Sequence, residues 1–382
     1  MDPIVSNAHE QFREKIRDFA VKEIRPVATQ LDATGEFSTD LTLKMGKLGL
    51  LGINIPENYG GAGMDTLSYI IAVEELARVD GSQAATVAAH NSLGLAPIYY
   101  YGTEAQKKKY LPRLTAGDKL WAFGLTEPLA GSDSRNTLTS ARLENGQWVI
   151  NGEKLFITNS ASSFAAGATI QAVTGINDGQ KELSVILIDR DTPGYEAEAI
   201  HSKMMWRAAD TGKLFFKEVK VPEENLLGQR GQGDKIMLAT LDGGRLSIAA
   251  MGLGLAQGAY EMAMDYAGKR EQFGRPIARF QAIQFKLADM ALKIELARNL
   301  LYKACWLKDK AQPFGKEAAM AKLYCSEIAR EVADESLQIH GAHGLMKYND
   351  IERFYRDQRI LQIGEGTSEI LRVVISRHIG LR

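Results

Sequence analysis

The chain has 382 residues, of which 45% are hydrophobic and 24% charged, the composition of an ordinary globular protein with two or three domains or layers. Its formal net charge of −1 excludes a surface that attracts nucleic acid or an anionic membrane as a whole, although a local basic patch could still bind a phosphorylated ligand. Its two cysteines, Cys305 and Cys325, lack the spacing of a disulfide framework or a metal site, so we expect no bound metal and a reducing compartment.

The first residues, MDPIVSNAHEQF, contain no basic region followed by an apolar run and are not rich in arginine and serine. We therefore expect neither a secretory signal nor a mitochondrial presequence, and we take the cytoplasm as the location. No uninterrupted apolar run reaches about 18 residues, so we expect no membrane span.

Residues 1–120 show helical periodicity. Phe12, Ile16, Phe19 and Ile24 fall near one helix face, and TLSYIIAVEELARV repeats the pattern. The stretch IPENYGGAGMD between them predicts a loop, because its proline and glycines oppose a regular element. We expect an N-terminal helical domain here.

Residues 121–230 change to the period of β-strands. The stretch LENGQWVINGEKLFITN contains two Asn-Gly pairs, at 145–146 and 151–152, and Asn-Gly is the strongest short-range hairpin signal. ELSVILIDRD and KLFFKEVKVP predict further strands, the last ending at Pro222. Two-residue turns join antiparallel strands, so we expect an antiparallel barrel or sheet in the middle of the chain.

Residues 231–382 return to long helices, of which LSIAAMGLGLAQGAYEMAMDYAGKR and FQAIQFKLADMALKIELARNLLYKACWLKDK are the clearest. The stretch GLGLAQG resembles a dinucleotide-binding fingerprint, but Gln257 replaces the third glycine and no strand precedes it. We interpret its small residues as a close helix crossing. The chain is therefore expected to be mainly α-helical with a β middle domain.

Two loops combine turn formers with groups that could bind a ligand. FGLTEPLAGSDS, residues 123–134, could donate hydrogen bonds to a polar ligand, although its composition alone favours an ordinary domain-boundary loop. KREQFGRPIARFQ holds Arg270, Arg275 and Arg279 beside Phe273, a cluster that could bind a pyrophosphate next to a stacked ring. An exposed helix connection with incidental arginines is the equal alternative.

Glu365 lies between Gly364 and Gly366, directly before an expected final helix with Thr367 or Ser368 as its N-cap. Glycines mark places where the backbone takes unusual dihedrals or approaches another group closely. Glu365 is therefore either a carboxylate stabilised by the helix dipole or a general base approached by a substrate. Burial would raise its pKa and the helix dipole would lower it.

Together, in this order and spacing, these stretches resemble the acyl-CoA dehydrogenase family over essentially the whole chain. FGLTEPLAGSDS resembles its flavin and substrate loop, FITN a flavin-contacting strand, LDGGR a CoA-contacting turn, KREQFGRP an interface loop, and QIHGAHG with EGTSE the C-terminal flavin and base segments. The resemblance implies a helical domain over residues 1–120, an antiparallel β-barrel or sheet domain over 121–230, and a C-terminal four-helix bundle over 231–382.

The resemblance also implies FAD as the cofactor and an acyl-CoA as the substrate. The implied FAD-binding residues are Phe123, Leu125, Thr126, Gly131, Ser132, Phe156, Ile157, Thr158, Arg270, Phe273, Gln281, Gln338, Gly341, Ala342, Thr367 and Glu369. Of these, Arg270, Gln281 and the segment 338–342 would reach the FAD of a neighbouring subunit. The implied acyl-CoA contacts are Ser132, Asp242, Gly243, Gly244, Arg245 and Gly366.

In this family a glutamate abstracts the α-proton while the β-hydrogen leaves as hydride to flavin N5, which gives a trans-2-enoyl-CoA. The resemblance implies that Glu365 abstracts this proton and that electron-transferring flavoprotein accepts the electrons. It also implies a homotetramer. A carboxylate of ordinary pKa, about 4.3, is a weak base for a thioester α-proton, so the site must stabilise the enolate. In the family the hydrogen bonds come from the N–H of the base itself and a ribityl hydroxyl.

Most family members place the base in the EGT segment, whereas the isovaleryl branch places it on the long helix. This chain has Gly244 at the helix position and an acid at 365, which favours Glu365. Gly364 replaces a common Tyr, Phe156 a usual Trp and Ala342 a second glycine. The missing Tyr ring predicts room for a short linear, branched or cyclic acyl group, and the absence of Arg in HNSLGLAPI argues against a dicarboxylic one.

Two other functions fit parts of the pattern. An acyl-CoA oxidase or flavin monooxygenase on the same scaffold would reoxidise its flavin rapidly in air, and a non-catalytic helical interaction protein would bind none. The presence of both Glu365 and DGGR favours the dehydrogenase. The sequence does not specify chain length, pathway or direction.

Overall fold

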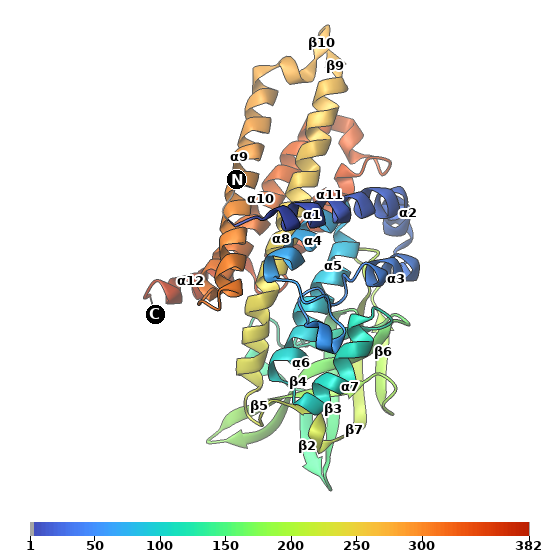
Figure 1. Ribbon diagram of the computed structural model, residues 1–382, viewed down its shortest axis with the longest axis vertical. Helices are drawn as coiled ribbons and strands as arrows, with labels where there is room; N and C mark the ends of the chain where they lie inside the picture. Colours follow the sequence, from blue (N-terminus) through green and yellow to red (C-terminus); the bar gives the residue numbers. More distant parts are fainter. Residues whose placement is uncertain (1–3, 382) are drawn as a thin grey trace.

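The structure, a computed structural model, describes residues 4–381. An N-terminal group of helices is followed by a sheet and then by long helices, which confirms the predicted fold class (Figure 1). The sheet occupies one end of the long axis, and the tip formed by β9 (Glu271–Gln272) and β10 (Arg275–Pro276) lies at the other. The two ends of the molecule therefore carry different parts of the predicted site.

The N-terminal group is built around a helix that is buried on all sides. Every residue of α4 (Thr66–Ala77) is buried, because the helix packs against α1 (Asn7–Phe19), α8 and α9. The predicted apolar face is only part of this buried surface. The other N-terminal elements are η1 (Ala20–Ile24), α2 (Arg25–Thr34), α3 (Thr39–Lys47), η2 (Glu57–Tyr59), α5 (Gly81–Ala89), η3 (His90–Leu95), α6 (Ala96–Tyr101) and α7 (Glu104–Thr115).

The middle of the chain forms one eight-stranded sheet in the order β6-β7-β3-β2-β4-β5-β8, with β1 paired to β4. Most pairs are antiparallel, as expected, but β1 and β2 each pair with β4 in parallel, which the two-residue turns did not indicate. The strands are β1 (Leu120–Gly124), β2 (Ser140–Glu144), β3 (Gln147–Thr158), β4 (Ala165–Asn177), β5 (Gln180–Asp189), β6 (Tyr195–Ala199), β7 (Thr211–Pro222) and β8 (Leu226–Leu227). In both cases the chain passes through β3 before it reaches β4, and these long connections permit the parallel pairing.

The two Asn-Gly pairs have different roles. Asn145 and Gly146 both have positive φ and form the predicted two-residue turn between β2 and β3. The second pair does not turn the chain but lies inside β3, where the register against β7 shifts between Ile150 and Gly152. Gly152 is required there because a Cβ would lie 2.6 Å from the Cα of Thr139.

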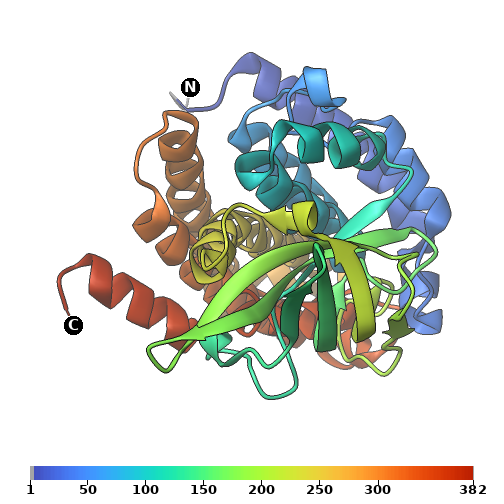
Figure 2. The ribbon, with the colours of Figure 1, turned by 90° about the horizontal axis from the view of Figure 1, so that it is seen from below.

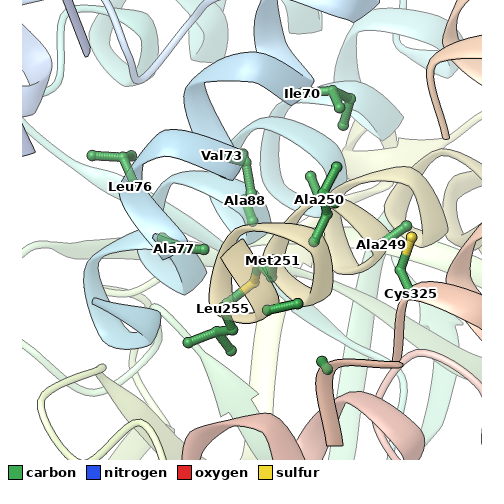
Figure 3. Packing of buried hydrophobic residues seen from close by; sticks show 14 of the residues in the cluster. Ile70, Val73, Leu76, Ala77, Ala88, Ala249, Ala250, Met251, Leu255 and Cys325 are labelled. Carbon is green, nitrogen blue, oxygen red and sulfur yellow. The ribbon is translucent and has the colours of Figure 1, made fainter. Parts of the chain in front are cut away.

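The C-terminal part is a bundle of long helices, with α8 at the centre of the molecule (Figure 2). A Cβ at Gly252 would lie 2.7 Å from the carbonyl oxygen of Cys325, and one at Gly254 would lie 2.8 Å from the Cβ of Ala77. The small residues therefore form close helix crossings with α10 and α4, as predicted (Figure 3). The helices are α8 (Gly233–Lys269), α9 (Gln281–Asp309), α10 (Gly315–His340), α11 (Ile351–Asp357) and α12 (Ser368–His378), with short η5 (Glu223–Asn225), η6 (Ile277–Arg279), η7 (Gly341–Leu345) and η8 (Gln358–Gln362).

Among residues 4–381, α8 is the one helix long and apolar enough to cross a membrane by length and composition. However, 72% of its most apolar window is buried inside the protein. The apolar residues of α8 are thus used for packing against α4, α5 and α10, as in the core helix of a globular protein.

Candidate active site

Glu365 occupies a tight turn between η8 and α12. Its φ of 52° and the φ of 97° at Gly366 place two consecutive residues in the left-handed region. Such a conformation costs a non-glycine residue about 1–2 kcal/mol and is often found at functional sites. Thr367 follows as the N-cap of α12, and its hydroxyl accepts a hydrogen bond from the Ile370 N–H at 3.2 Å.

The carboxyl group of Glu365 points into the protein. The residue is half-exposed as a whole, but its Oε2 is fully buried and has no hydrogen-bond partner within residues 4–381. Burial raises the pKa of Glu365 to about 7, against the opposing effect of the positive charges on Lys322 and Arg245. Burial therefore outweighs the charges that favour the ionised form.

Glu365 packs against the bare backbone of α8 at Gly244. A Cβ at Gly244 would overlap Oε2 of Glu365 and would lie 3.2 Å from Cδ2 of Leu93. Glu365 and Gly244, which the family resemblance names as the two alternative positions of the base, are thus neighbours in space. The segment LDGGR is helical and not the predicted turn, because packing of α8 outweighs the cost of about 1 kcal/mol for each glycine in a helix.

Arg245 provides a second unpartnered group. It is 5% exposed, and its Nη1 bonds to Oδ1 of Asp242. Its Nε is buried without a partner within the described residues. A buried unpaired polar atom costs about 1–3 kcal/mol, so unpaired atoms of opposite charge on Arg245 and Glu365 indicate that a ligand completes this site.

The π-helix η3 connects this site to the sheet. Leu93 contacts the Gly244 position, and a Cβ at Gly94 would lie 2.6 Å from the carbonyl oxygen of Trp121 in β1. His90 accepts the Trp121 N–H through Nδ1 at 3.2 Å, and its Nε2 lies 3.1 Å from the carbonyl oxygen of Leu114. Burial lowers the pKa of His90 to about 4, so it is a neutral structural residue. Single-turn π-helices often occur at functional sites.

The loop after β1 is held by a buried ion pair that the sequence did not reveal. Lys154 Nζ donates to Glu127 Oε1 at 2.7 Å, and the Glu127 carboxylate also accepts the N–H groups of Leu138 and Thr139. The Leu155 N–H donates to the Thr126 carbonyl at 2.9 Å. The loop 123–134 and the FITN segment are therefore fixed side by side. Sequence offers only one hint, a lysine among the apolar residues of a strand.

The implied flavin-contacting residues of this region fit a planar aromatic ligand. Phe156 is 64% exposed and has a φ of 61°, so its aromatic ring faces solvent and its backbone is strained. Phe123 and Ile157 are buried, Leu125, Thr126 and Thr158 are half-buried, and Gly131 and Ser132 are exposed. Exposed apolar surface of this kind marks a binding site when it lies beside polar donors.

A second set of implied cofactor residues lies at the other end of the molecule. Phe273 lies in the β9–β10 tip, and Arg270 and Gln281 lie on either side of it. The segment 338–342 ends α10 nearby, where His340 stacks on Tyr266 with ring centroids 4.5 Å apart. All the implied contacts in this set are exposed, Phe273 by 93%. The structure does not bring them to Glu365 of the same chain.

Lys322 is a further residue of the site that the sequence did not indicate. It lies on α10 and is 0% exposed, and its Nζ donates to the Gly366 carbonyl at 2.6 Å. Burial lowers its pKa to about 8, whereas the nearby Glu365 raises it. The sequence offered no signal for this role, because Lys322 meets Gly366 only in the folded chain.

Three family models cover the chain: "Acyl-CoA dehydrogenase, N-terminal domain" over residues 6–118, "middle domain" over 122–219 and "C-terminal domain" over 231–380. The probable acyl-CoA dehydrogenase YngJ of Bacillus subtilis (strain 168) is 49% identical over 376 residues, 98% of each chain.

Solved structures agree in fold. The butyryl-CoA dehydrogenase from Megasphaera elsdenii is 41% identical with a TM-score of 0.96, covering 99% of this chain and 100% of that one. A chain from a structure of the electron transferring flavoprotein of Acidaminococcus fermentans is 42% identical with a TM-score of 0.96 and full coverage of both chains. An acyl-CoA dehydrogenase from Bacillus anthracis complexed with FAD is 36% identical with a TM-score of 0.91, covering 98% of this chain and 67% of that one.

Proposed function

The chain belongs to the acyl-CoA dehydrogenase family of FAD-dependent oxidoreductases and is of the short-chain, butyryl type, and we propose that Glu365 is the base with which it oxidises a short acyl-CoA at the Cα–Cβ bond. The observation that carries this proposal is the buried, unpartnered Oε2 of Glu365 beside the bare backbone of Gly244. This arrangement leaves a buried carboxylate oxygen that no group of the described residues binds and that is available to a substrate.

Glu365 takes the α-proton of the thioester. Its pKa of about 7 makes it a stronger base than an ordinary glutamate, while a large fraction is still ionised near neutral pH. The same burial excludes water, which would otherwise solvate the carboxylate and reduce its basicity.

The turn that holds Glu365 also supplies a hydrogen-bond donor. The backbone N–H of Glu365 donates no hydrogen bond within residues 4–381. It is free to donate to the thioester carbonyl and so to stabilise the negative charge that develops when the α-proton leaves. Gly366 lets the substrate approach this backbone. Ser132 and the segment 242–245 would hold the CoA part of the substrate.

FAD, when bound, supplies the hydride acceptor. In one chain the segments 123–132 and 156–158, with Thr367 and Glu369, would hold it. The distant set, consisting of Arg270, Phe273, Gln281, Gln338, Gly341 and Ala342, would hold the FAD of a neighbouring copy in a homotetramer. Figure 1 shows the β9–β10 tip far along the long axis from α12, just before which Glu365 lies, and this separation supports the assignment.

Electron-transferring flavoprotein is the acceptor that we propose, because a structure from an electron transferring flavoprotein system contains a chain with a TM-score of 0.96 to this one. Anaerobic reduction by butyryl-CoA followed by addition of either air or this flavoprotein separates the dehydrogenase from an oxidase. Slow reoxidation in air and fast reoxidation by the flavoprotein are expected. Reoxidation by air within seconds would make the chain an oxidase. We propose a cytoplasmic location from the bacterial relative.

The base is tested by Glu365→Gln. The variant should bind FAD and butyryl-CoA but lose flavin reduction by at least about 10²–10⁴-fold, the usual contribution of a general base. Glu14→Gln, at an exposed position of α1, is the matched control and should reduce its flavin at the wild-type rate. Stopped-flow absorbance at 450 nm measures both. Substantial flavin reduction by the Glu365→Gln protein would place the base on another residue.

A further inference from the structure

The segment that carries Glu365 is attached along one face of α10. Ser326 Oγ donates to the Leu361 carbonyl at 3.0 Å, and the Ser326 carbonyl accepts from Gln362 Nε2 at 2.6 Å. Ser368 Oγ donates to Glu327 Oε1 at 2.7 Å, beyond the turn. Between these two attachments, Lys322 is the one residue of α10, among those that the structure describes, whose side chain binds the turn, through the Gly366 carbonyl.

Lys322 is unusual because it is a fully buried cation without a salt bridge. Within residues 4–381 no carboxylate oxygen lies within 4.0 Å of its Nζ, and the Gly366 carbonyl is its one hydrogen-bond acceptor. Burying an ammonium group is costly unless nearby groups compensate it. The acid that compensates it most strongly is Glu365, ahead of Glu327 and Glu369.

We propose that Lys322 is the positioning residue of the base: its hydrogen bond to Gly366 holds the left-handed turn, and its positive charge favours the ionised form of the buried Glu365 carboxyl group. The inference rests on the proposed function of Glu365. Lys322 does not touch the reacting atoms in this scheme. It acts through the carboxylate and through the peptide that follows it.

Three elements present titratable groups to Glu365. Lys322 comes from α10, Arg245 from α8 and Tyr69 from α4. Tyr69 stays uncharged because burial raises its pKa further, and its hydroxyl donates to the Ala88 carbonyl. Arg245 is already paired with Asp242, so part of its charge is compensated. Lys322 is thus the main unpaired charge that favours the carboxylate.

Removal of the charge on Lys322 should therefore raise the pKa of Glu365. An opposite charge nearby lowers a carboxyl pKa by about 1–3 units, so Lys322→Met should move the midpoint of the pH profile of flavin reduction toward alkaline pH by about one unit or more. Flavin reduction at pH 7 should fall about fivefold for a one-unit rise, because fewer carboxyl groups are then ionised.

The control is Lys316→Met on the same helix. Lys316 is half exposed and lies 3.4 Å from the neighbouring Glu317, so its loss should leave the midpoint unchanged. A second readout does not depend on turnover: the difference in thermal stability between proteins with Glu and with Gln at position 365, measured as a function of pH. In both backgrounds this difference should begin near pH 4.5, the pKa of an unfolded glutamate, but in the Lys322→Met background it should keep growing to higher pH and become larger than in the wild type.

Lys322→Gln and Lys322→Arg keep the test decisive if the Met variant does not fold. The Gln variant removes the charge and should shift the midpoint, whereas the Arg variant keeps the charge and should shift it much less. A folded, FAD-loaded neutral variant with the wild-type midpoint in both readouts would overturn the proposal. If the Glu365→Gln protein reduces its flavin at the wild-type rate, the proposed role of Glu365 as the base is wrong. The stability readout still shows in that case whether Lys322 controls the ionisation of Glu365.

Discussion

At the scale of single residues, Glu365 combines a left-handed backbone with a buried, unpaired oxygen. Its pKa is about 7 in the folded protein and has the ordinary value, 4.5, in an unfolded chain. The folded protein therefore keeps the proton to higher pH than the unfolded chain does. The contribution of the Glu365 carboxyl group to the free energy of unfolding is therefore fully present below pH 4.5 and is lost as the pH rises through 7.

Glu365→Gln should accordingly stabilise the protein at pH 8 but not at pH 4.5. The expected gain at pH 8 is about 1–3 kcal/mol, because each pKa unit corresponds to about 1.4 kcal/mol. Thermal unfolding of both proteins across this pH range measures it. Asp357 is also buried, with a pKa of about 7, so the difference between the two proteins is needed to isolate Glu365. Parallel stability curves for both proteins would contradict the assigned pKa.

Gly364 is the residue that we expect to set acyl-group tolerance. A Cβ there would meet only ordinary contacts, with Ile360 Cδ1 at 3.7 Å, so the backbone at this position accepts a β-carbon without moving. Gly364→Tyr should lower kcat/KM for 2-methylbutyryl- and cyclohexanecarboxyl-CoA by about tenfold or more relative to butyryl-CoA, because it fills the space that a branch needs. If the wild-type protein accepts only butyryl-CoA, the prediction that Gly364 leaves room for a branched or cyclic acyl group is wrong.

The residues of the site differ in how far the sequence could predict them. Glu365 and Gly244 could be paired because the family that the sequence resembles places its base at one or the other of these two positions. Lys154 with Glu127 and Lys322 with Gly366 could not, because these pairs are separated by 27 and 44 residues and meet only after the chain folds. A buried lysine looks like a surface lysine until its neighbours are known.

At the scale of elements, the Asn-Gly pairs show why a local signal is incomplete. The pair at 145–146 turns the chain because β2 and β3 can pair on either side of it. The pair at 151–152 lies where β3 continues alongside β7, and Gly152 is used for close approach to Thr139. The hairpin between β4 and β5 uses Asp178 and Gly179, which is an equivalent sequence signal.

The buried pair of Lys154 and Glu127 gives a prediction for the element that it anchors. Lys154→Met leaves a buried carboxylate without its counter-ion, so the free energy of unfolding should fall by about 3 kcal/mol. FAD should also bind more weakly, because the loop 123–134 loses its attachment to β3. Arg142→Met is the control on the neighbouring strand: its ion pairs are exposed and should contribute less than about 1 kcal/mol.

Thermal unfolding and fluorescence titration with FAD measure these two effects. Adding Glu127→Gln to the Lys154→Met protein should recover part of the stability, because the uncompensated charge is then removed. A Lys154→Met protein as stable as the wild type, with unchanged FAD affinity, would show that the pair does not anchor the loop.

At the scale of the whole molecule, the change of period from helix to strand and back was enough to predict the three-part order. It could not predict that α8 runs along most of the molecule. Gly244 in α8 therefore lies beside Glu365, whereas the C-terminal end of the same helix leads into the β9–β10 tip. Two parts of one predicted cofactor site are thereby separated. A single chain of this fold is incomplete as an FAD site if both parts are needed.

Subunit mixing tests whether the distant set serves a neighbour. Arg270→Ala should lower FAD retention and activity, and Glu365→Gln should abolish activity. In a mixed dimer, the site built on the Arg270→Ala chain keeps its own Glu365 and receives Arg270 from the other chain, so it is intact. Refolding the two variants together in equal amounts should then restore about a quarter of wild-type activity by random pairing in a closed dimer. If Arg270 served its own chain, neither site of the hybrid would be complete, and the mixture would be no more active than the two variants kept apart.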